Sequence, residues 1–347
     1  MKEAIVHPDT SVTLHDVPVP TPSKDQVLIR VAAFGTNPKD WKYPKWKDYS
    51  HNAGDDVAGI VEAVGENVFE FKKGDRVAGF HVMGDPAGVF AEYSIVPAHT
   101  TFHIPESTSF EEAATIPLAA LTAAIGLFHK LELPSPWQVK DEDTNIPLVI
   151  YGASTSVGAF AIKLASASKI HPIIAVGSST SKFVTDEYLD PSKGDALVDY
   201  TAHKSPEALV SAIKEAITKA GVPDGRVYHA FDSVSEHGSY DKILSNVLAG
   251  AEDKSKRSLV ATVLPQEGKN INGVEADMTS VGWSHSGGFA GTTFSNIWSA
   301  LFGRGLQQGW FKPHPHEIIP GGLDGLEEAL KKLKDGKVRA KKLVGKF

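Results

Sequence analysis

The sequence predicts an α/β protein with two lobes, a barrel-like β lobe and a doubly wound parallel sheet. Up to about residue 122, short apolar runs are separated by glycine and proline, a pattern typical of strands joined by turns. From residue 148, strand-like runs alternate with stretches of helical periodicity, which indicates a parallel sheet. The chain has 347 residues, enough for two domains with separate cores.

The first lobe is expected to be mostly β. We expect helices there only within residues 109–130, and strands at 4–6, 27–33, 56–64, 75–80 and 90–96. Near the end of the chain, residues 323–333 form an amphipathic helix and 341–344 a closing strand, which we expect to return to the first lobe. The expected domains are therefore a discontinuous one, 1–122 with 312–347, and a second one, 123–311. Residues 132–145 are polar and proline-broken, and we expect a surface loop.

The second lobe is expected to begin with a strand at 148–151 and a helix with apolar positions from Val157 to Ala165. A helix capped by Ser205 is expected at 206–220. The remaining expected elements are strands at 173–176, 196–198, 227–231 and 259–264, a helix from Ser181 and a helix ending at Leu248. A nucleotide-binding lobe in the middle of the chain follows from this order.

Composition excludes several classes of protein. Hydrophobic content of 41%, charged content of 22% and a net charge of −7 describe a globular chain, and no long basic block suggests nucleic acid or an anionic membrane as a partner. The first residues lack the apolar core of a signal peptide, and no run approaches the roughly 18 apolar residues of a membrane helix. We therefore expect a cytoplasmic protein.

The chain contains no cysteine, which excludes disulfides, thiol nucleophiles, iron–sulfur clusters and thiolate-rich zinc sites. Its 14 histidines do not form a ligand spacing on an evident helix. We expect no metal site.

The turn between the strand at 148–151 and the helix after it is a candidate phosphate-binding loop. The strict dinucleotide fingerprint GxGxxG falls on Ala153, Thr155 and Gly158, so the match is weak by itself. Small residues still allow close approach of the backbone, and a helix N-terminus attracts phosphate. A strand-to-helix turn without a ligand would look similar. The residues expected to contact the cofactor here are Gly152, Ser154, Thr155, Ser156, Val157 and Gly158.

The segment after the second strand of this lobe favours NADP(H) over NAD(H). Chains specific for NAD place a carboxylate about 20 residues after the glycine loop. Here no carboxylate precedes Asp186, and the segment instead offers hydroxyl groups and one cation, on Ser179, Thr180, Ser181 and Lys182. These groups suit a 2′-phosphate, although a helix cap would also explain the hydroxyls.

Several motifs occur together in a family-specific order. They are GTNPKDWK at 35–42, GDDVAGIVEAVGENV at 54–68, KKGDRVAG at 72–79, GVFAEYSIV at 88–96, AATIPLAALTA at 113–123 and a closing GGLDGLEEALKKLKDGKV. In this order the chain resembles the medium-chain dehydrogenase/reductases over nearly its whole length. It is most similar to their zinc-independent quinone-reductase and enoyl-reductase branch, in particular the fungal toxD-like reductases that work with polyketide synthases. The resemblance implies a GroES-like β-barrel lobe beside a Rossmann-type doubly wound sheet.

The resemblance also implies roles for individual residues. The zinc ligands of the alcohol dehydrogenases fall on Asn37, Asp55 and Asp56, so zinc is not expected and the two carboxylates are expected to support the turn and the floor of the site. Tyr200 is expected near the 2′-phosphate. The other positions expected beside the cofactor are Lys39, Asp40, Trp41 and Lys42, Leu264 and Pro265 on the nicotinamide side, and, with a weaker match, Val338 and Arg339.

The chemistry implied is an NADPH-dependent reduction of an activated C=C bond in an enoyl thioester or an enone, without a metal. Lys42 is the first candidate for the polar group beside the substrate carbonyl, and Thr122 the second; each also has a plain structural interpretation, as a solvated lysine and as a helix residue bonding its own backbone. Water can supply the proton. Aromatic residues in the segments 41–46 and 283–311 are more often core than ligand contacts, but if half of them face a cleft the substrate is apolar.

Two alternatives stay open from the sequence. One is an NADPH quinone reductase, and the other is a cofactor-binding structural or RNA-binding protein without turnover. We expect a small apolar carbonyl substrate, either free or as an acyl chain on a carrier protein. The sequence does not decide between a monomer and a homodimer.

Overall fold

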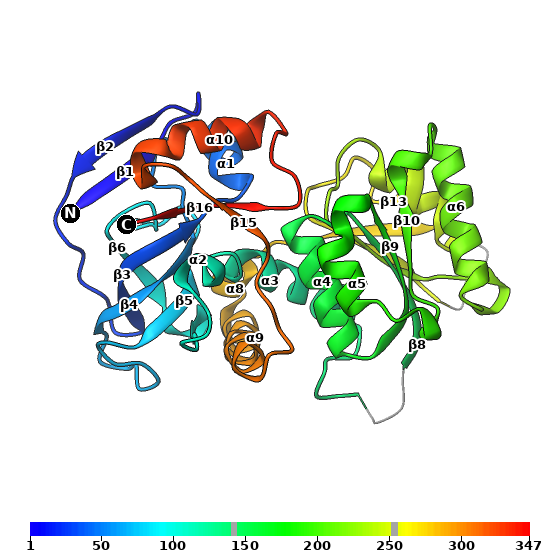
Figure 1. Ribbon diagram of the computed structural model, residues 1–347, viewed down its shortest axis with the longest axis horizontal. Helices are drawn as coiled ribbons and strands as arrows, with labels where there is room; N and C mark the ends of the chain where they lie inside the picture. Colours follow the sequence, from blue (N-terminus) through cyan, green and yellow to red (C-terminus); the bar gives the residue numbers. More distant parts are fainter. Residues whose placement is uncertain (140–143, 251–255) are drawn as a thin grey trace. The chain divides into compact units, whose positions relative to one another are not determined.

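The computed structural model describes residues 1–139, 144–250 and 256–347 (Figure 1). These residues form two compact units, one made of Met1–Leu121 with Val281–Phe347 and the other of Thr122–Ser280. The first unit is therefore discontinuous along the chain. The division differs from the expected boundaries at residues 281–311, which lie with the first unit because their long helix packs there, with the rings of Phe102 and Phe302 6.1 Å apart.

The first unit contains a curved, mainly antiparallel sheet with the strand order β15-β16-β3-β4-β5-β7, and β6 pairs with β3. Two register shifts between β3 and β4, at Leu28/Ile29 and Val31/Ala33, bend the long strand β3, as bulges do in barrels. Beside this sheet lies the hairpin β1-β2. The strands are β1 (Lys2–Val6), β2 (Val12–Asp16), β3 (Gln26–Gly35), β4 (Asp56–Val64), β5 (Arg76–Phe80), β6 (Tyr93–Pro97), β7 (Thr101–His103), β15 (His316–Ile318) and β16 (Lys342–Lys346).

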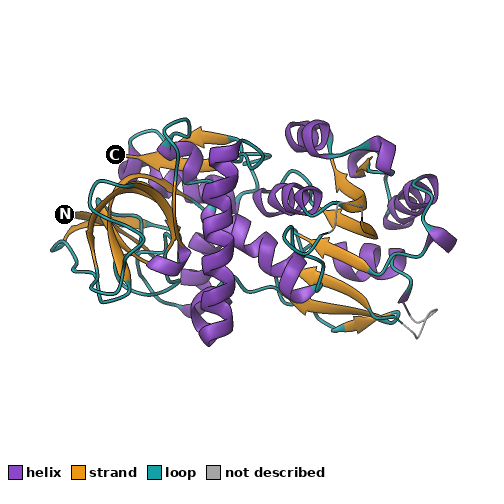
Figure 2. Cartoon of the chain, turned by 90° about the horizontal axis from the view of Figure 1, so that it is seen from below, coloured by secondary structure: helices purple, strands orange, loops and turns teal. Residues whose placement is uncertain are grey.

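Helices cover this sheet, and four of them, α1, η1, α8 and α9, were not predicted. Helix α1 contains Pro44, and proline is the strongest signal against a helix interior. Helix α9 contains four glycines, which lower its helix propensity, yet it runs for 21 residues beside the strands of this unit (Figure 2). The helices are α1 (Lys39–Lys47), η1 (Ala98–Thr100), α2 (Phe110–Ala113), α8 (Trp283–Ser286), α9 (Gly288–Gln308), η9 (Gly322–Gly325) and α10 (Leu326–Lys334).

The second unit contains a parallel sheet with the strand order β10-β9-β8-β11-β12-β14, which is the 3-2-1-4-5-6 order of a doubly wound nucleotide-binding fold. The two-residue strand β13 pairs antiparallel with β14 at one edge. Neither β13 nor β14 was predicted. The strands are β8 (Thr144–Tyr151), β9 (Ile170–Gly177), β10 (Ala196–Asp199), β11 (His229–Asp232), β12 (Ser258–Thr262), β13 (Asn270–Ile271) and β14 (Val274–Met278).

Helices lie on both faces of this sheet (Figure 1). Leu209, Ile213 and Ile217 of α6 share a core with strand residues such as Val149 and Val260, while α4 contacts β8 and β9. The helical elements are η2 (Ile125–Lys130), α4 (Ser156–Ala167), η3 (Ser179–Ser181), α5 (Lys182–Tyr188), η4 (Pro191–Lys193), η5 (Tyr200–Ala202), α6 (Pro206–Lys219), η6 (Pro223–Gly225), η7 (Ser239–Leu244) and α7 (Ser245–Val247).

Two further expectations concern single segments. Part of the expected surface loop at 132–145, residues 140–143, lies outside the described residues. Among the described residues, one helical run, Phe110–Lys130, has the length and apolar composition of a membrane span, contrary to the expectation that no run approaches this. Its apolar character has a simple cause, because 83% of its most apolar 18-residue window is buried inside the protein. Helix α3 (Pro117–Ala124) forms the middle of this run.

Candidate functional site

The carboxyl ends of the parallel strands place most of the expected cofactor residues along one edge of the sheet. Tyr151 pairs with Val176 and with Asp232, and Asp232 pairs with Thr262, so the loops that follow β8, β9, β11 and β12 start side by side. The chain order reverses between β8 and β11, and doubly wound folds bind nucleotides at this point.

The loop after β8 has the geometry of a phosphate cradle. Gly152 has a φ of +90°, a conformation that favours glycine. A Cβ on Gly158 would lie 2.3 Å from the carbonyl oxygen of Gly152, so only glycine lets helix α4 start this close to the loop. The amides of Ser156 and Val157 begin α4 and have no acceptor within the helix. This arrangement fits a dinucleotide pyrophosphate.

The Thr155 hydroxyl is engaged within the loop. It accepts the N–H of Gly158 at 2.9 Å as the cap of α4 and donates to the Ser233 hydroxyl at 2.9 Å. Ser233 in turn donates to the carbonyl oxygen of Tyr151 at 2.6 Å. Thr155 and Ser233 thus connect the loops after β8 and β11, and Ser233 was not singled out in the sequence. The loop groups left for phosphate are the helix amides and the hydroxyls of Ser154 and Ser156.

The expected 2′-phosphate residues separate into two groups. Ser181 is fully buried and its hydroxyl accepts the N–H of Ser178, so it supports the turn from inside. Ser179, Thr180 and Lys182 are exposed. Tyr200 is 42% exposed. It follows Asp199, which pairs with Gly177 across the sheet, so the backbone of Tyr200 lies beside the start of the same turn. Four of the five expected groups are accessible to a phosphate.

A buried carboxylate orders the loop after β11, and a hydroxyl of this loop joins it to the loop after β12. Asp232 accepts the N–H groups of Val234 and Ser235 at 3.0 and 2.8 Å, and burial raises the pKa of its carboxyl group against these hydrogen bonds. The hydroxyl of Ser235 accepts the N–H of Val263 at 2.9 Å, which fixes the start of the segment carrying Leu264 and Pro265. Leu264 is half-buried and Pro265 is exposed. The Asp-x-x-Ser spacing from Asp232 to Ser235, typical of a side-chain-stabilised turn, was the available sequence signal.

In the first unit, Asp55 and Asp56 are both buried but point to different partners. Asp56 accepts a hydrogen bond from Asn37 Nδ2 at 2.7 Å and forms an ion pair with Lys342. Asp55 forms an ion pair with Lys39 and contacts His81 Nδ1 at 3.1 Å. Both carboxylates are thus engaged by side chains of the same unit, and the expectation that they support the turn and the floor of the site stays a prediction. Lys342 and His81 were not singled out in the sequence.

Charges in the Lys39 cluster shift several pKa values. Burial raises the pKa of Asp40 to about 7, although Lys39 lies 3.1 Å away and opposes the shift. For Asp55, burial would raise the pKa, but Lys39 and His81 outweigh it and hold the pKa below its ordinary value. The same two carboxylates raise the pKa of Lys39 against the effect of its burial. Lys39 is therefore an internal counter-ion, and Asp40 accepts the N–H of Asn37 at 2.7 Å.

The other expected residues of the first unit lie on its helices and C-terminal segment. Lys42 is half-buried on α1, with Nζ 5.6 Å from the centre of the Trp41 ring, and Trp41 is half-buried too. Val338 packs against the core, and Arg339 is exposed. Thr122 is 5% exposed on α3, the helix that crosses the boundary between the units.

The aromatic residues divide between core and surface. Trp298, Phe302 and Phe311 are almost completely buried, and Phe302 stacks on Phe311 with ring centres 5.0 Å apart. These three are core residues. Trp46 and Phe289 are 60% and 87% exposed. Burial of the three core rings thus weakens the sequence argument for an apolar substrate.

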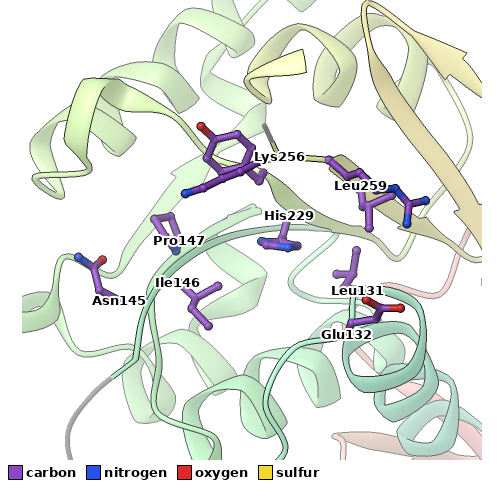
Figure 3. A pocket seen from close by; sticks show the side chains of 10 residues that line it. Leu131, Glu132, Asn145, Ile146, Pro147, His229, Lys256 and Leu259 are labelled. Atoms are coloured by element: carbon purple, nitrogen blue, oxygen red, sulfur yellow. The ribbon is translucent and has the colours of Figure 1, made fainter. Parts of the chain in front are cut away.

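No group of three or more metal-ligating side chains that could hold an ion occurs in the described parts of the chain. A pocket of about 560 Å³ lies at the opposite, amino-terminal edge of the parallel sheet, where His229 faces it from β11 (Figure 3). Its other walls include Leu131, Ile146, Pro147, Lys256 and Leu259. It lies away from the loops that follow the strands, so it is not the candidate nucleotide site.

Comparisons with known proteins agree with this architecture. Residues 23–106 match the alcohol dehydrogenase GroES-like domain. The trans-enoyl reductase fsr4 of Gibberella fujikuroi is 41% identical over 94% of this chain and 92% of its own length, and the trans-enoyl reductase resD of Aspergillus sclerotiorum is 31% identical over 97% of both chains. The Escherichia coli quinone oxidoreductase complexed with NADPH has the same fold, with a TM-score of 0.72, 18% identity and coverage of 99% of this chain and 100% of that one. The chain therefore belongs to the medium-chain dehydrogenase/reductases, in the branch that contains the fungal trans-enoyl reductases, and is an oxidoreductase.

Proposed function

We propose that the protein reduces the C=C bond of an α,β-unsaturated carbonyl compound, an enoyl thioester or an enone, with NADPH. The observation that carries the cofactor choice is the turn after β9, where Ser179, Thr180 and Lys182 are exposed and no carboxylate occurs from residue 178 to 185. A carboxylate there would repel a 2′-phosphate, whereas a lysine and two hydroxyls can bind it. The printed names of the relatives, trans-enoyl reductases, support the choice of substrate.

The chain's own groups account for binding and orientation. The amides of Ser156 and Val157 and the hydroxyls of Ser154 and Ser156 bind the pyrophosphate. Leu264 and Pro265 form a wall for the nicotinamide, at the end of a segment that Ser235 holds in place. The bound cofactor supplies a hydride to the β-carbon of the substrate.

Reduction also needs stabilisation of the enolate oxygen and a proton for the α-carbon. We assign the first role to the Lys42 ammonium, with the Thr122 hydroxyl as the second donor, and the proton to water. Lys39 is not assigned this role, because its ammonium contacts Asp40, Asp55 and the carbonyl oxygen of Ala53.

A metal is not part of this proposal. Zinc would need the carboxylates of Asp55 and Asp56, and each is already neutralised by a cation of the protein, Lys39 for one and Lys342 for the other. We predict that the purified protein contains less than about one zinc per ten chains, since displacing a paired buried cation carries a desolvation cost. Elemental analysis measures this, and stoichiometric zinc would contradict the assignment.

The test of the proposed function is turnover with defined substrates. Purified protein is mixed with NADPH deuterated at the transferred position and with a series of enoyl thioesters from four to about twelve carbons, enones and quinones. We expect saturated products with deuterium on the β-carbon, and solvent-derived hydrogen on the α-carbon, as the assigned roles require. Consumption of quinones alone would identify a quinone reductase. Tight NADPH binding without turnover on any substrate would favour a binding protein.

A further inference from the structure

Asp56 connects the first turns of two helices. Its Oδ1 accepts the N–H of Leu118, the second residue of α3, at 2.6 Å, and its Oδ2 accepts Asn37 Nδ2 at 2.7 Å, two residues before α1. The carboxylate is fully buried. A negative charge at a helix N-terminus is favourable, so Asp56 also suits the start of α3 electrostatically.

Lys342 of the C-terminal strand β16 completes this arrangement. Its ammonium contacts Asp56 and two other oxygens, Asn37 Oδ1 at 3.1 Å and the carbonyl oxygen of Thr115 at 3.5 Å. Three acceptors match the three N–H groups of the ammonium. The side chain is 2% exposed, and it passes Gly35 so closely that a Cβ there would lie 2.8 Å from Lys342 Cε. The lysine has little room to move.

The two helices that Asp56 and Lys342 hold carry the two candidate catalytic residues. Lys42 lies on α1, and Thr122 lies on α3 four residues after Leu118, one turn further along the same face. A tilt of either helix at its first turn would therefore move the side chain that follows. Displacements of about 1 Å can cost about 100-fold in rate.

We propose that Asp56 and Lys342 are positioning residues that jointly set α1 and α3, and through them Lys42 and Thr122, for reduction. This inference rests on the proposed function. A gain in stability does not explain why this ion pair is buried, because well-packed apolar residues of similar volume often stabilise a protein equally or better. What the pair adds is a set of directed hydrogen bonds joining β4, β16 and the starts of two helices.

The experiment compares Lys342→Met with Lys341→Met, a matched control one residue earlier whose ammonium lies 3.5 Å from Glu317 at the surface. Substrate turnover and NADPH affinity are measured for each. We expect Lys342→Met to lower kcat by about 10- to 100-fold while the Kd for NADPH changes by less than about threefold. Lys342→Arg should recover part of kcat, and Lys341→Met should match the wild type.

Two further measurements separate positioning from folding. The double variant Asp56→Asn/Lys342→Met removes both charges, and we expect it to be more stable than Lys342→Met but still slow, because the charge imbalance is gone and the three-way anchor is not restored. Hydrogen exchange in Lys342→Met should accelerate at 39–42 and 118–122 and stay unchanged in α10.

The inference is overturned if Lys342→Met lowers the melting temperature but leaves kcat of the folded enzyme unchanged, or if exchange in α1 and α3 does not respond. The second readout needs no substrate. If the wild type reduces no unsaturated carbonyl compound, the proposed function fails, and the exchange pattern still decides whether Lys342 holds the two helices.

Discussion

Asp40 shows how burial and a neighbouring cation compete at a single residue. Its carboxylate is fully buried, with Lys39 3.1 Å away and Asp55 contributing a like charge. The effect of burial is larger than the opposing effect of Lys39, and the pKa of Asp40 rises to about 7. The folded protein thus holds a proton on Asp40 at a pH where the unfolded chain has released it.

This shift predicts a pH-dependent difference between the wild type and Asp40→Asn. Because the pKa is raised on folding, from 3.8 to about 7, the stabilisation is complete below about pH 4 and is lost as the pH rises through about 7. Asparagine mimics the protonated form at every pH. We expect equal melting temperatures near pH 4 and an advantage of a few degrees for the variant near pH 8. Asp48→Asn, at the exposed end of the same helix, is the control; a constant offset across pH would contradict the pKa assignment.

The expected preference for NADPH over NADH depends on a single side chain, that of Lys182. It is exposed in the first turn of α5, beside Ser179 and Thr180. An ammonium–phosphate contact strengthens binding of NADPH and has no counterpart in NADH. Lys182→Ala should raise the Kd for NADPH about tenfold and leave the Kd for NADH unchanged. Lys214→Ala, on the exposed side of α6, is the control. Equal loss for both cofactors would remove the assignment.

At the element scale, the start of α4 depends on close packing against the loop before it. The hydroxyl of Ser233 would lie 2.7 Å from a Cβ on Gly158, in addition to the short contact with Gly152. We predict that Gly158→Ala weakens NADPH binding at least tenfold, because the loop must shift and its amides then point away from the phosphates. Titration calorimetry measures this. Ser166→Ala near the end of the same helix should bind normally, and normal binding by Gly158→Ala would show that the loop adapts.

Some elements could be predicted and others could not, for physical reasons. The alternation after residue 148 is a strong signal because strands buried on both faces and amphipathic helices differ in period. Helix α1 was missed because Pro44 argues against a helix, yet it forms where Asp40 and Asn37 order its first turn. Strand β14 was missed because only Val274 among its five residues is buried, so the apolar signal is faint.

The candidate site could be proposed from the sequence where its residues are close together along the chain. The loop from Gly152 to Gly158 and the turn to Lys182 are local patterns, and the structure places them at one sheet edge. The role of Lys342 could not be predicted, since it pairs with a residue 286 positions away and its neighbours in the sequence indicate only a basic segment. Ser233 was missed for the same reason, because its partner Thr155 lies on another loop.

At the scale of the whole molecule, the chain leaves the first unit near Leu121 and returns to it at Val281. The second unit is continuous. Strand β16 inserts between β15 and β3, so it is an interior strand of the first sheet. Removing it would expose the hydrogen-bonding groups of two strands and delete Lys342.

This arrangement predicts the behaviour of a chain that ends at residue 341. We expect the first unit to become sensitive to protease, while a fragment close to 122–280 resists digestion and still binds NADPH, without turnover. Mass spectrometry of a timed digest measures the fragments, and the full-length chain is the control. Equal resistance of both units would show that β16 is dispensable.

The place of β16 also sets the order of events on the ribosome. Residues 122–280 can acquire their fold while later residues are still being translated, but Lys342, which we propose to position α1 and α3, is added only with β16. A nascent chain stalled between residues 281 and 341 would contain the whole second unit but lack Lys342. On the proposed function, such a chain would bind the dinucleotide without reducing a substrate.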